Sequence, residues 1–287
     1  HIILRYRYDQ FGRTMQSFIS QLRKTAIKCA TFCCPMLKMQ ATNALYTDLS
    51  GYYDLMCCDI NYLQQSQGII RLQQLFGNAG LQHLDLACGT GPHIRHFIDA
   101  GFQCQGLDLN QPMLTLARAR CPEAKFLLGD MCRFELVQPV DLITCFLYSI
   151  HYTGTLELLA DCIARVYHAL TPGGIFCFNA VDKTKICNLS AVSHSTYYQN
   201  ARFDFASAWY YSGSGEQQAL KLKISKTTKL EQEYWQDEHP MVAVSFTELA
   251  ELLSPYFDIQ ILAHDYQRIQ AWDQHAGNAL FVCIKRD

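Results

Sequence analysis

The residues best placed to do chemistry lie in the string Leu84-Asp85-Leu86-Ala87-Cys88-Gly89-Thr90-Gly91, where an apolar run enters a glycine turn. Gly89 and Gly91 let the backbone turn tightly and approach a ligand without an intervening Cβ atom. Open α/β sheets bind their ligands at the carboxyl ends of the strands. The string therefore predicts a ligand site directly after a strand, with a structural tight turn as the simpler alternative.

The spacing argues against two common phosphate sites. A dinucleotide fingerprint needs a third glycine where this chain has Ile94, and no Gly-Lys-Ser/Thr follows to make a P-loop. Asp85 would repel a pyrophosphate but suits a ligand that carries an ammonium group. S-adenosylmethionine (SAM) has an ammonium group, a sulfonium and no phosphate, so it fits the turn better than a nicotinamide dinucleotide.

A second acid, Asp108, ends the next apolar run. At a strand end a carboxylate can accept hydrogen bonds from both hydroxyls of a ribose. The alternative is a helix cap for the segment from Asn110 onward. We expect Asp108 to be exposed and to contribute little to the core.

Apolar runs alternate with helical periodicity, which indicates βαβ units and a parallel sheet. The expected strands of this sheet are residues 81–87, 103–109, 125–128, 140–147, 174–180, 257–264 and 278–285. The expected helices are residues 92–100, 112–121, 156–170 and 246–256. Strand-like runs at 203–211, 219–226 and 229–235 predict an antiparallel insertion that covers one face. The predicted fold is α/β: a Rossmann-like, seven-stranded, mostly parallel sheet with helices on both faces and a small antiparallel β insertion.

The predicted organisation has five parts: a basic extension (1–38), a helical cap over the cofactor site (39–80), a SAM-binding core (81–182), a β-rich insertion or acceptor lid (183–243) and the C-terminal part of the core sheet (244–287). The extension has Asp9 as its acid among several Lys and Arg residues. We expect a solvated appendage, or an upstream segment with Met39 as the start, rather than a membrane-surface or partner helix.

Composition excludes several classes of protein. A formal net charge of -2 gives no global field that would attract nucleic acid. No apolar run reaches the roughly 20 residues of a membrane span. The 14 cysteines show neither a Cys-x-x-Cys pair nor zinc-finger spacing, so we expect reduced thiols, no metal and a cytoplasmic protein.

The ordered motifs of residues 80–180 resemble those of class I SAM-dependent methyltransferases. The matching strings are 85–91, Asp108, 129–131, 140–143 and 170–174. Tyr52-Tyr53-Asp54, the stretch 146–152 and the β-rich insertion are similar to the small-molecule branch, which includes glycine-type and amino-sugar N-methyltransferases.

The resemblance implies a role for each motif residue. Asp85 (through water), Ala87 and Gly89 would hold the methionine part of SAM, with Cys88 and Gly91 completing the turn. Asp108 would bind the ribose, Leu109 would pack on the adenine, Asp130 would accept from the adenine amine, and the Met131 backbone would read the ring. Cys145 and Phe146 would line the sulfonium side, and Tyr53 would lie on a helix that closes over SAM.

The predicted reaction is in-line methyl transfer to a small-molecule acceptor, with an amine favoured. A protonated amine needs a base, and His151 is the candidate, with a capping or surface histidine as the alternative. Tyr46, Tyr62, Tyr148 and Tyr152 are possible pocket residues, and Trp235 and His239 are weaker candidates.

Three other functions compete with this prediction. They are a non-catalytic SAM-binding module, a nicotinamide-dependent dehydrogenase and a nucleic-acid methyltransferase. The last usually has an Asn/Asp-Pro-Pro-Tyr/Phe string after the fourth strand, where this chain has Leu147-Tyr148-Ser149-Ile150. We expect a small-molecule acceptor, no nucleic-acid partner, and a monomer or homodimer.

Overall fold

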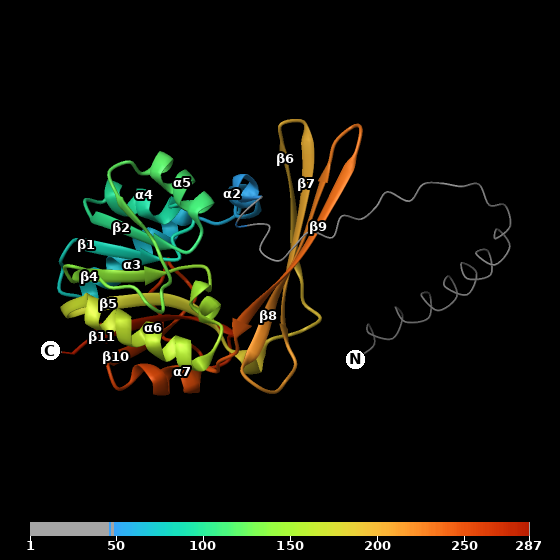
Figure 1. The fold of residues 1–287 in the computed structure, drawn as a ribbon. Helices are drawn as coiled ribbons and strands as arrows, with labels where there is room; N and C mark the ends of the chain where they lie inside the picture. The colour runs from blue at the N-terminus through green and yellow to red at the C-terminus, as the bar shows by residue number, and fades with distance from the viewer. Residues whose placement is uncertain (1–45, 47–48, 287) are drawn as a thin grey trace, which may run out of the picture. The chain divides into compact units, whose positions relative to one another are not determined.

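The computed structural model describes Tyr46 and residues 49–286, so the predictions for residues 1–38 lie outside the described residues (Figure 1). The helical elements are η2 (Ser50–Tyr52), α2 (Tyr53–Met56), α3 (Tyr62–Phe76), α4 (Pro92–Asp99), α5 (Gln111–Arg120), η3 (Ser149–Thr153), α6 (Leu156–Ala169), η4 (Lys183–Lys185) and α7 (Phe246–Leu253). The strands are β1 (Gln82–Leu86), β2 (Gln103–Asp108), β3 (Lys125–Leu128), β4 (Val140–Cys145), β5 (Leu170–Val181), β6 (Val192–Tyr198), β7 (Ala201–Tyr211), β8 (Gln217–Thr227), β9 (Gln232–Val242), β10 (Phe257–Ala263) and β11 (Asn278–Lys285).

The larger sheet has seven strands in the order β10-β11-β5-β4-β1-β2-β3. Neighbours from β5 through β3 pair in parallel, and β11 runs antiparallel to β5 and β10. This confirms the predicted α/β fold with a seven-stranded, mostly parallel sheet. The strand order reverses at β1 and β4, which is where open α/β sheets form a ligand crevice.

Helices cover both faces of this sheet. On one face α6 and α7 pack with Ile143, Phe176 and Phe281 in a single core cluster. On the other face α3, α4 and α5 pack with Leu142 and residues of the neighbouring strands. Because successive residues of β4 point into different cores, the strand reads as an unbroken apolar run, as parallel strands do when both faces are buried.

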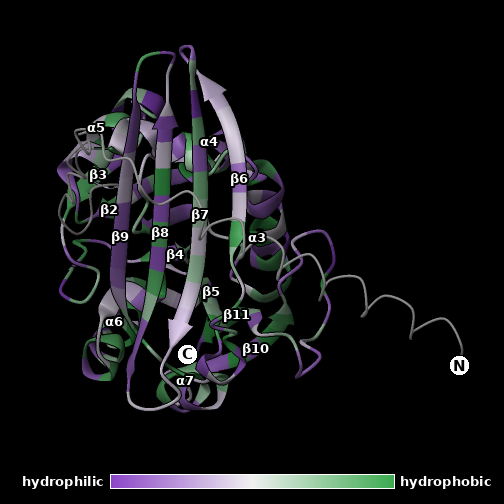
Figure 2. Cartoon of the chain, turned by 90° about the vertical axis from the view of Figure 1, so that its right-hand side faces the viewer, coloured by the Kyte–Doolittle hydropathy of each residue, from purple (hydrophilic) through white to green (hydrophobic). Residues whose placement is uncertain are grey.

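The insertion forms a separate antiparallel sheet in the order β6-β7-β8-β9. Leu222 and Ile224 of β8 are buried against η2 and α2, whereas Lys221 and Lys223, which alternate with them, are exposed. This sheet lies beside the parallel sheet, as two perpendicular views show (Figures 1 and 2), and β9 contacts η3 after the carboxyl end of β4. The expectation that it covers one face of the parallel sheet is therefore wrong, because helices occupy both faces.

Strand β6 is an additional strand that the sequence analysis did not predict. It spans Val192–Tyr198 at the edge of the sheet and is mostly exposed. Its Ser, His and Thr residues give no clear apolar alternation, because none of its residues is buried on either face of the strand.

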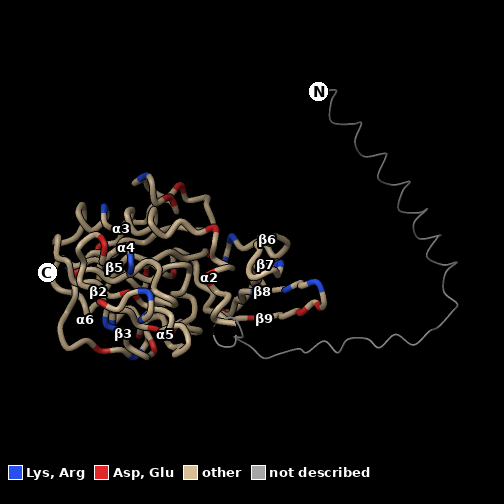
Figure 3. The backbone as a smooth tube through the Cα atoms, turned by 90° about the horizontal axis from the view of Figure 1, so that it is seen from above, with Lys and Arg blue, Asp and Glu red and all other residues tan. Residues whose placement is uncertain are grey.

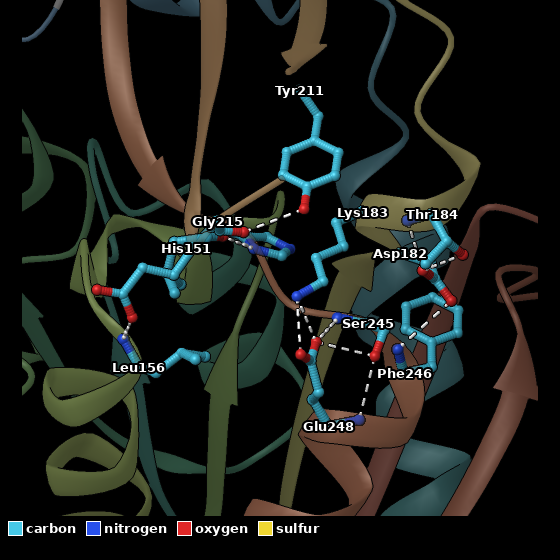
Figure 4. A network of polar contacts seen from close by, with 12 residues as sticks. His151, Leu156, Asp182, Lys183, Thr184, Tyr211, Gly215, Ser245, Phe246 and Glu248 are labelled. Carbon is cyan, nitrogen blue, oxygen red and sulfur yellow. Dashed lines mark hydrogen bonds and ion pairs between the residues drawn. The ribbon is translucent and has the colours of Figure 1, made fainter. Parts of the chain in front are cut away.

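The two ends of the insertion are fastened to each other. Lys183 donates to Glu248 Oε1 at 2.8 Å, and Glu248 also forms a capping box with Ser245 at the start of α7 (Figure 4). Asp182 accepts from the amide of Phe246 at 3.4 Å. These contacts hold the segments leaving and re-entering the parallel sheet side by side.

Three further observations on the described residues concern the cysteines, membrane-spanning helices and the distribution of charge. The described cysteines are free thiols. Within residues 46 and 49–286, no helix combines the length and apolarity required to cross a membrane. Acidic and basic residues are interspersed along the backbone of the described part (Figure 3).

Candidate functional site

A pocket of about 840 Å³, including its open mouth, lies at the carboxyl ends of β1, β2 and β4. The lining residues come from the glycine turn, the segments after β2 and β3, η3 and the N-terminal segment: Tyr46, Tyr53, Ala87, Gly89, Leu107, Asp108, Leu109, Asn110, Met113, Gly129, Asp130, Met131, Ser149 and Tyr152.

The glycine turn after β1 is built from left-handed residues. Ala87, Gly89 and Gly91 have φ values of 52°, 55° and 77°. A Cβ atom on Gly89 would meet only Tyr53 Cε1, at 4.0 Å, so the missing side chain leaves space for a ligand. Ala87 has a Cβ atom, and its left-handed conformation costs about 1 kcal/mol or more, a form of strain that clusters at ligand sites.

Asp108 joins the turn to the end of β2. Its Oδ2 accepts from the Gly89 amide at 2.9 Å, and its Oδ1 accepts from the Asn110 amide at 2.8 Å. The side chain is 7% exposed, and burial raises its pKa. The expectation of an exposed acid is therefore wrong, because the carboxylate organises the turn as well as facing the pocket.

Asp85 lies behind the turn, in register with Gly106 of β2 and Thr144 of β4. It is 2% exposed and accepts from Thr144 Oγ1 at 2.7 Å. Since Thr144 gives its hydrogen to Asp85, its oxygen accepts from His83 Nε2 at 2.8 Å. Burial raises the pKa of Asp85 to about 7, so a cation nearby would stabilise its charged form.

A polar clamp fixes the N-terminal segment over the turn. Thr90 Oγ1 donates to Asp54 Oδ1 at 2.7 Å, and Arg120 pairs with Asp54 and donates to the Thr90 carbonyl at 2.7 Å. Asp54 follows Tyr53 directly in α2. The clamp therefore holds the Tyr53 ring beside Gly89.

The structure brings seven of the twelve predicted SAM-binding residues to the pocket and leaves five outside its lining. The seven are Tyr53, Ala87, Gly89, Asp108, Leu109, Asp130 and Met131. Asp85, Cys88, Gly91, Cys145 and Phe146 do not line it. Cys145 is fully buried in the core, and Phe146 stacks on His93 at a centroid distance of 3.6 Å.

His151 does not line the pocket, in contrast to its predicted role as a base. It is fully buried, with Nδ1 3.0 Å from the Val242 carbonyl oxygen and Nε2 accepting from the Val181 amide at 3.0 Å. Burial lowers its pKa to about 4. Both ring nitrogens are thus occupied in joining β5 and β9, which is neither the capping nor the surface role considered as the alternative.

Sequence reasoning did not identify several pocket residues. Leu107, Asn110, Met113, Gly129 and Ser149 complete the lining. Leu107, Asn110 and Met113 lie close to Asp108 in the sequence, and Gly129 directly precedes Asp130. Their positions could therefore have indicated them as pocket residues. Ser149 gave no such signal, because its place depends on the left-handed pair Leu147 and Tyr148, with φ values of 53° and 62°.

The tyrosines divide into two groups. Tyr46 and Tyr152 line the pocket, and their hydroxyl oxygens are 2.7 Å apart. Tyr152 Oη is also 2.6 Å from His239 Nδ1. Tyr62 and Tyr148 lie outside the lining, and Trp235 packs with the insertion core.

The described residues contain no group of three or more His, Cys, Asp or Glu side chains arranged to hold a metal ion. The pocket presents the carboxyl groups of Asp108 and Asp130 together with the hydroxyl groups of Tyr46 and Tyr152. That arrangement suits an elongated ligand with hydroxyl and amine donors beside a polar second substrate.

Comparison with known proteins identifies the domain. Residues 84–174 match the family model described as a methyltransferase domain. The chain is 39% identical over 92 residues to the dTDP-3-amino-3,4,6-trideoxy-alpha-D-glucopyranose N,N-dimethyltransferase of Streptomyces venezuelae. That match covers 32% of this chain and 39% of the relative, so the chain matches well under half of the relative's length.

Two solved structures share the fold. The crystal structure of Streptomyces venezuelae DesVI has a TM-score of 0.73 and 22% identity, covering 83% of this chain and 99% of that one. SAM-bound CalS10, an amino pentose methyltransferase from Micromonospora echinaspora, has a TM-score of 0.70 and 17% identity, covering 90% of this chain and 99% of that one. Residues 84–174 of this chain are therefore similar to methyltransferase domains, which agrees with the resemblance noted in the motifs of that segment.

Proposed function

We propose that the protein is a SAM-dependent methyltransferase that transfers a methyl group to the amine of a small-molecule acceptor. The observation that carries this proposal is the pocket itself. It joins the glycine turn and Asp108 of the matched domain to the hydroxyl groups of Tyr46 and Tyr152. The relatives named as amino-sugar N,N-dimethyltransferases support an amine acceptor, and an amino sugar is the acceptor we propose to try first.

The residues of the pocket fit SAM. Asp108 and Asp130 supply acceptors for the ribose hydroxyls and the adenine amine, and Leu109 and Met131 supply apolar contact for the ring. Gly89 leaves open the space that a side chain would fill, which suits the methionine part of SAM. Asp85 lies behind the turn and outside the lining, where an ammonium group nearby would stabilise the charged form of its buried carboxyl group.

SAM supplies a methyl group that is already activated by its sulfonium. The protein must therefore mainly align the acceptor, exclude water and accept a proton. Tyr53, held over the turn by the clamp of Asp54 and Arg120, shields the pocket from one side. We propose that residues 183–243 act as the acceptor lid, because His239 of β9 is hydrogen-bonded to Tyr152 of the pocket lining at 2.6 Å.

The test begins with calorimetric titrations of SAM, S-adenosylhomocysteine and NADH into the purified chain. We expect micromolar binding of the first two and none of NADH. Binding of NADH alone, or of none of the three, would overturn the proposal. Formation of S-adenosylhomocysteine is then followed with dTDP-3-amino-3,4,6-trideoxy-α-D-glucopyranose as acceptor, and tight SAM binding without turnover on any amine tested would favour the non-catalytic SAM-binding module.

A further inference from the structure

We propose that Tyr46, Tyr152 and His239 form a proton path that deprotonates the acceptor amine. The inference deepens the proposed function and rests on it. Tyr46 is the catalytic residue that contacts the amine, and Tyr152 and His239 act through it. The path begins in the pocket lining and ends on the inserted sheet.

The three side chains form a continuous hydrogen-bonded chain. Tyr46 Oη lies 2.7 Å from Tyr152 Oη, which lies 2.6 Å from His239 Nδ1. The rings also pack together, with centroid distances of 5.2 Å between Tyr46 and His239 and 5.7 Å between Tyr152 and His239. The geometry is therefore fixed by three segments that are far apart in the sequence.

The direction of the hydrogen bonds follows from the far end of the chain. His239 Nε2 lies 3.6 Å from Asp237 Oδ2, which is longer than a hydrogen bond, but the negative charge of the carboxylate favours the ring tautomer that carries its hydrogen on Nε2. The ring hydrogen is therefore on Nε2, which leaves Nδ1 to accept from Tyr152. Tyr152 in turn accepts from Tyr46, so the Tyr46 oxygen offers its free lone pairs to the pocket.

This direction of the hydrogen bonds suits an ammonium group that donates a proton to the Tyr46 oxygen. When an amine N–H proton moves to Tyr46, the Tyr46 proton moves to Tyr152 and the Tyr152 proton moves to His239 Nδ1. The amine regains its lone pair, and His239 becomes an imidazolium facing Asp237. The amine nitrogen then bonds to the methyl carbon while the carbon–sulfur bond breaks, its electron pair staying on sulfur. The imidazolium later returns its proton to water along the same path.

The surroundings keep His239 ready to accept a proton. The side chain is fully buried, and burial lowers its pKa, so it is neutral near pH 7 while Asp237 opposes the shift. Burial raises the pKa of Tyr46 and of Tyr152, so both hydroxyls stay protonated and pass protons rather than store charge. The titratable groups facing the path are Asp237 beside His239 and Tyr53 beside Tyr46, with Asp108 and Cys57 also acting on Tyr46.

His239→Asn is the central variant, because the amide can still accept from Tyr152 but cannot take up a proton. Tyr46→Phe and Tyr152→Phe interrupt the path at its other two positions. Tyr148→Phe is the matched control. Tyr148 directly precedes η3, which contains Tyr152, but its hydroxyl group accepts a hydrogen bond from Asn278 Nδ2 at 3.2 Å and it does not line the pocket. SAM affinity and Tm, measured for each variant, show whether it is folded.

The readout is kcat/KM against pH from 6 to 9 with SAM and dTDP-3-amino-3,4,6-trideoxy-α-D-glucopyranose. A positioned base contributes about 100-fold or more, so the three path variants should lose about that much at pH 7. Their rates should then rise about tenfold per pH unit, because they depend on amine that is already neutral in solution. The wild type and Tyr148→Phe should show no such slope near neutral pH.

The outcomes separate the inference from the function on which it rests. Wild-type turnover with path variants that keep the wild-type pH profile would overturn the inference alone. A loss in the path variants that is equal at every pH would also overturn it, since that would indicate a structural role. No SAM binding by the wild type would overturn the proposed function and the inference together.

Discussion

Replacing Asp85 with Asn should stabilise the ligand-free protein at neutral pH while weakening SAM binding. The carboxyl group is buried beside Thr144, and burial raises its pKa from 3.8 to about 7. The folded protein therefore holds the proton more tightly than the unfolded chain. The resulting contribution to stability is present below about pH 4 and is lost as pH rises through about 7.

The size of the effect follows from the same values. A rise of about three pH units in a pKa corresponds to about 4 kcal/mol of lost stability well above pH 7. Asn removes this charge and keeps an oxygen to accept from Thr144, but its new amide group lacks a partner, which costs about 1–3 kcal/mol. The net gain for Asp85→Asn should therefore be about 1–3 kcal/mol at pH 8 and should disappear by pH 5.

Urea unfolding at pH 5, 6, 7 and 8 measures this difference. Asp99→Asn is the matched control, because Asp99 is an exposed carboxylate paired with Arg95 on α4. A difference between Asp85→Asn and wild type that is the same at every pH would refute the reasoning. In calorimetry at pH 8, the loss of the negative charge should weaken SAM binding by about tenfold, equivalent to about 1.4 kcal/mol.

Three further predictions concern the rest of the site. Asp108→Ala should lower SAM affinity about 10–100-fold in calorimetry and cost about 1–3 kcal/mol in urea unfolding, because amides that it satisfies lose their acceptor; unchanged affinity would remove the ribose assignment. Arg120→Gln should change stability by less than about 1 kcal/mol but speed SAM dissociation several-fold in stopped flow, because its half-exposed pair with Asp54 holds Tyr53 over the turn; an unchanged dissociation rate would contradict this role. His151→Ala should lower the free energy of unfolding by about 2–5 kcal/mol and Tm by about 5–15 °C without changing SAM affinity. Because burial lowers the pKa of His151, the wild type should lose stability as pH falls from 6.5 through about 4, and the variant should not show this loss.

The strands of the mostly parallel sheet and the place of the glycine turn could be predicted from the sequence. Parallel strands that are buried on both faces consist of unbroken apolar runs. The closely spaced Gly89 and Gly91 indicate a tight turn, because glycine adopts positive φ values readily. The ends of β3 and β11 agree with the expected strands residue for residue. These features depend on short stretches of chain, so local patterns carry them. Edge strand β6 escaped because its exposed residues leave no such pattern.

The environment of each polar side chain was decided by tertiary structure. The sequence placed Phe146 at the end of the fourth strand and His151 just after it, but only packing showed that both are buried. The same packing brought His239, which the sequence ranked as a weak candidate, behind Tyr152. The hydrogen-bond partners of His151 and His239 are residues 30 to 91 positions away, which no local pattern records. The sequence by itself therefore determined the scaffold and the glycine-turn part of the pocket, whereas the part lined by Tyr46 and Tyr152 exists only where distant segments meet.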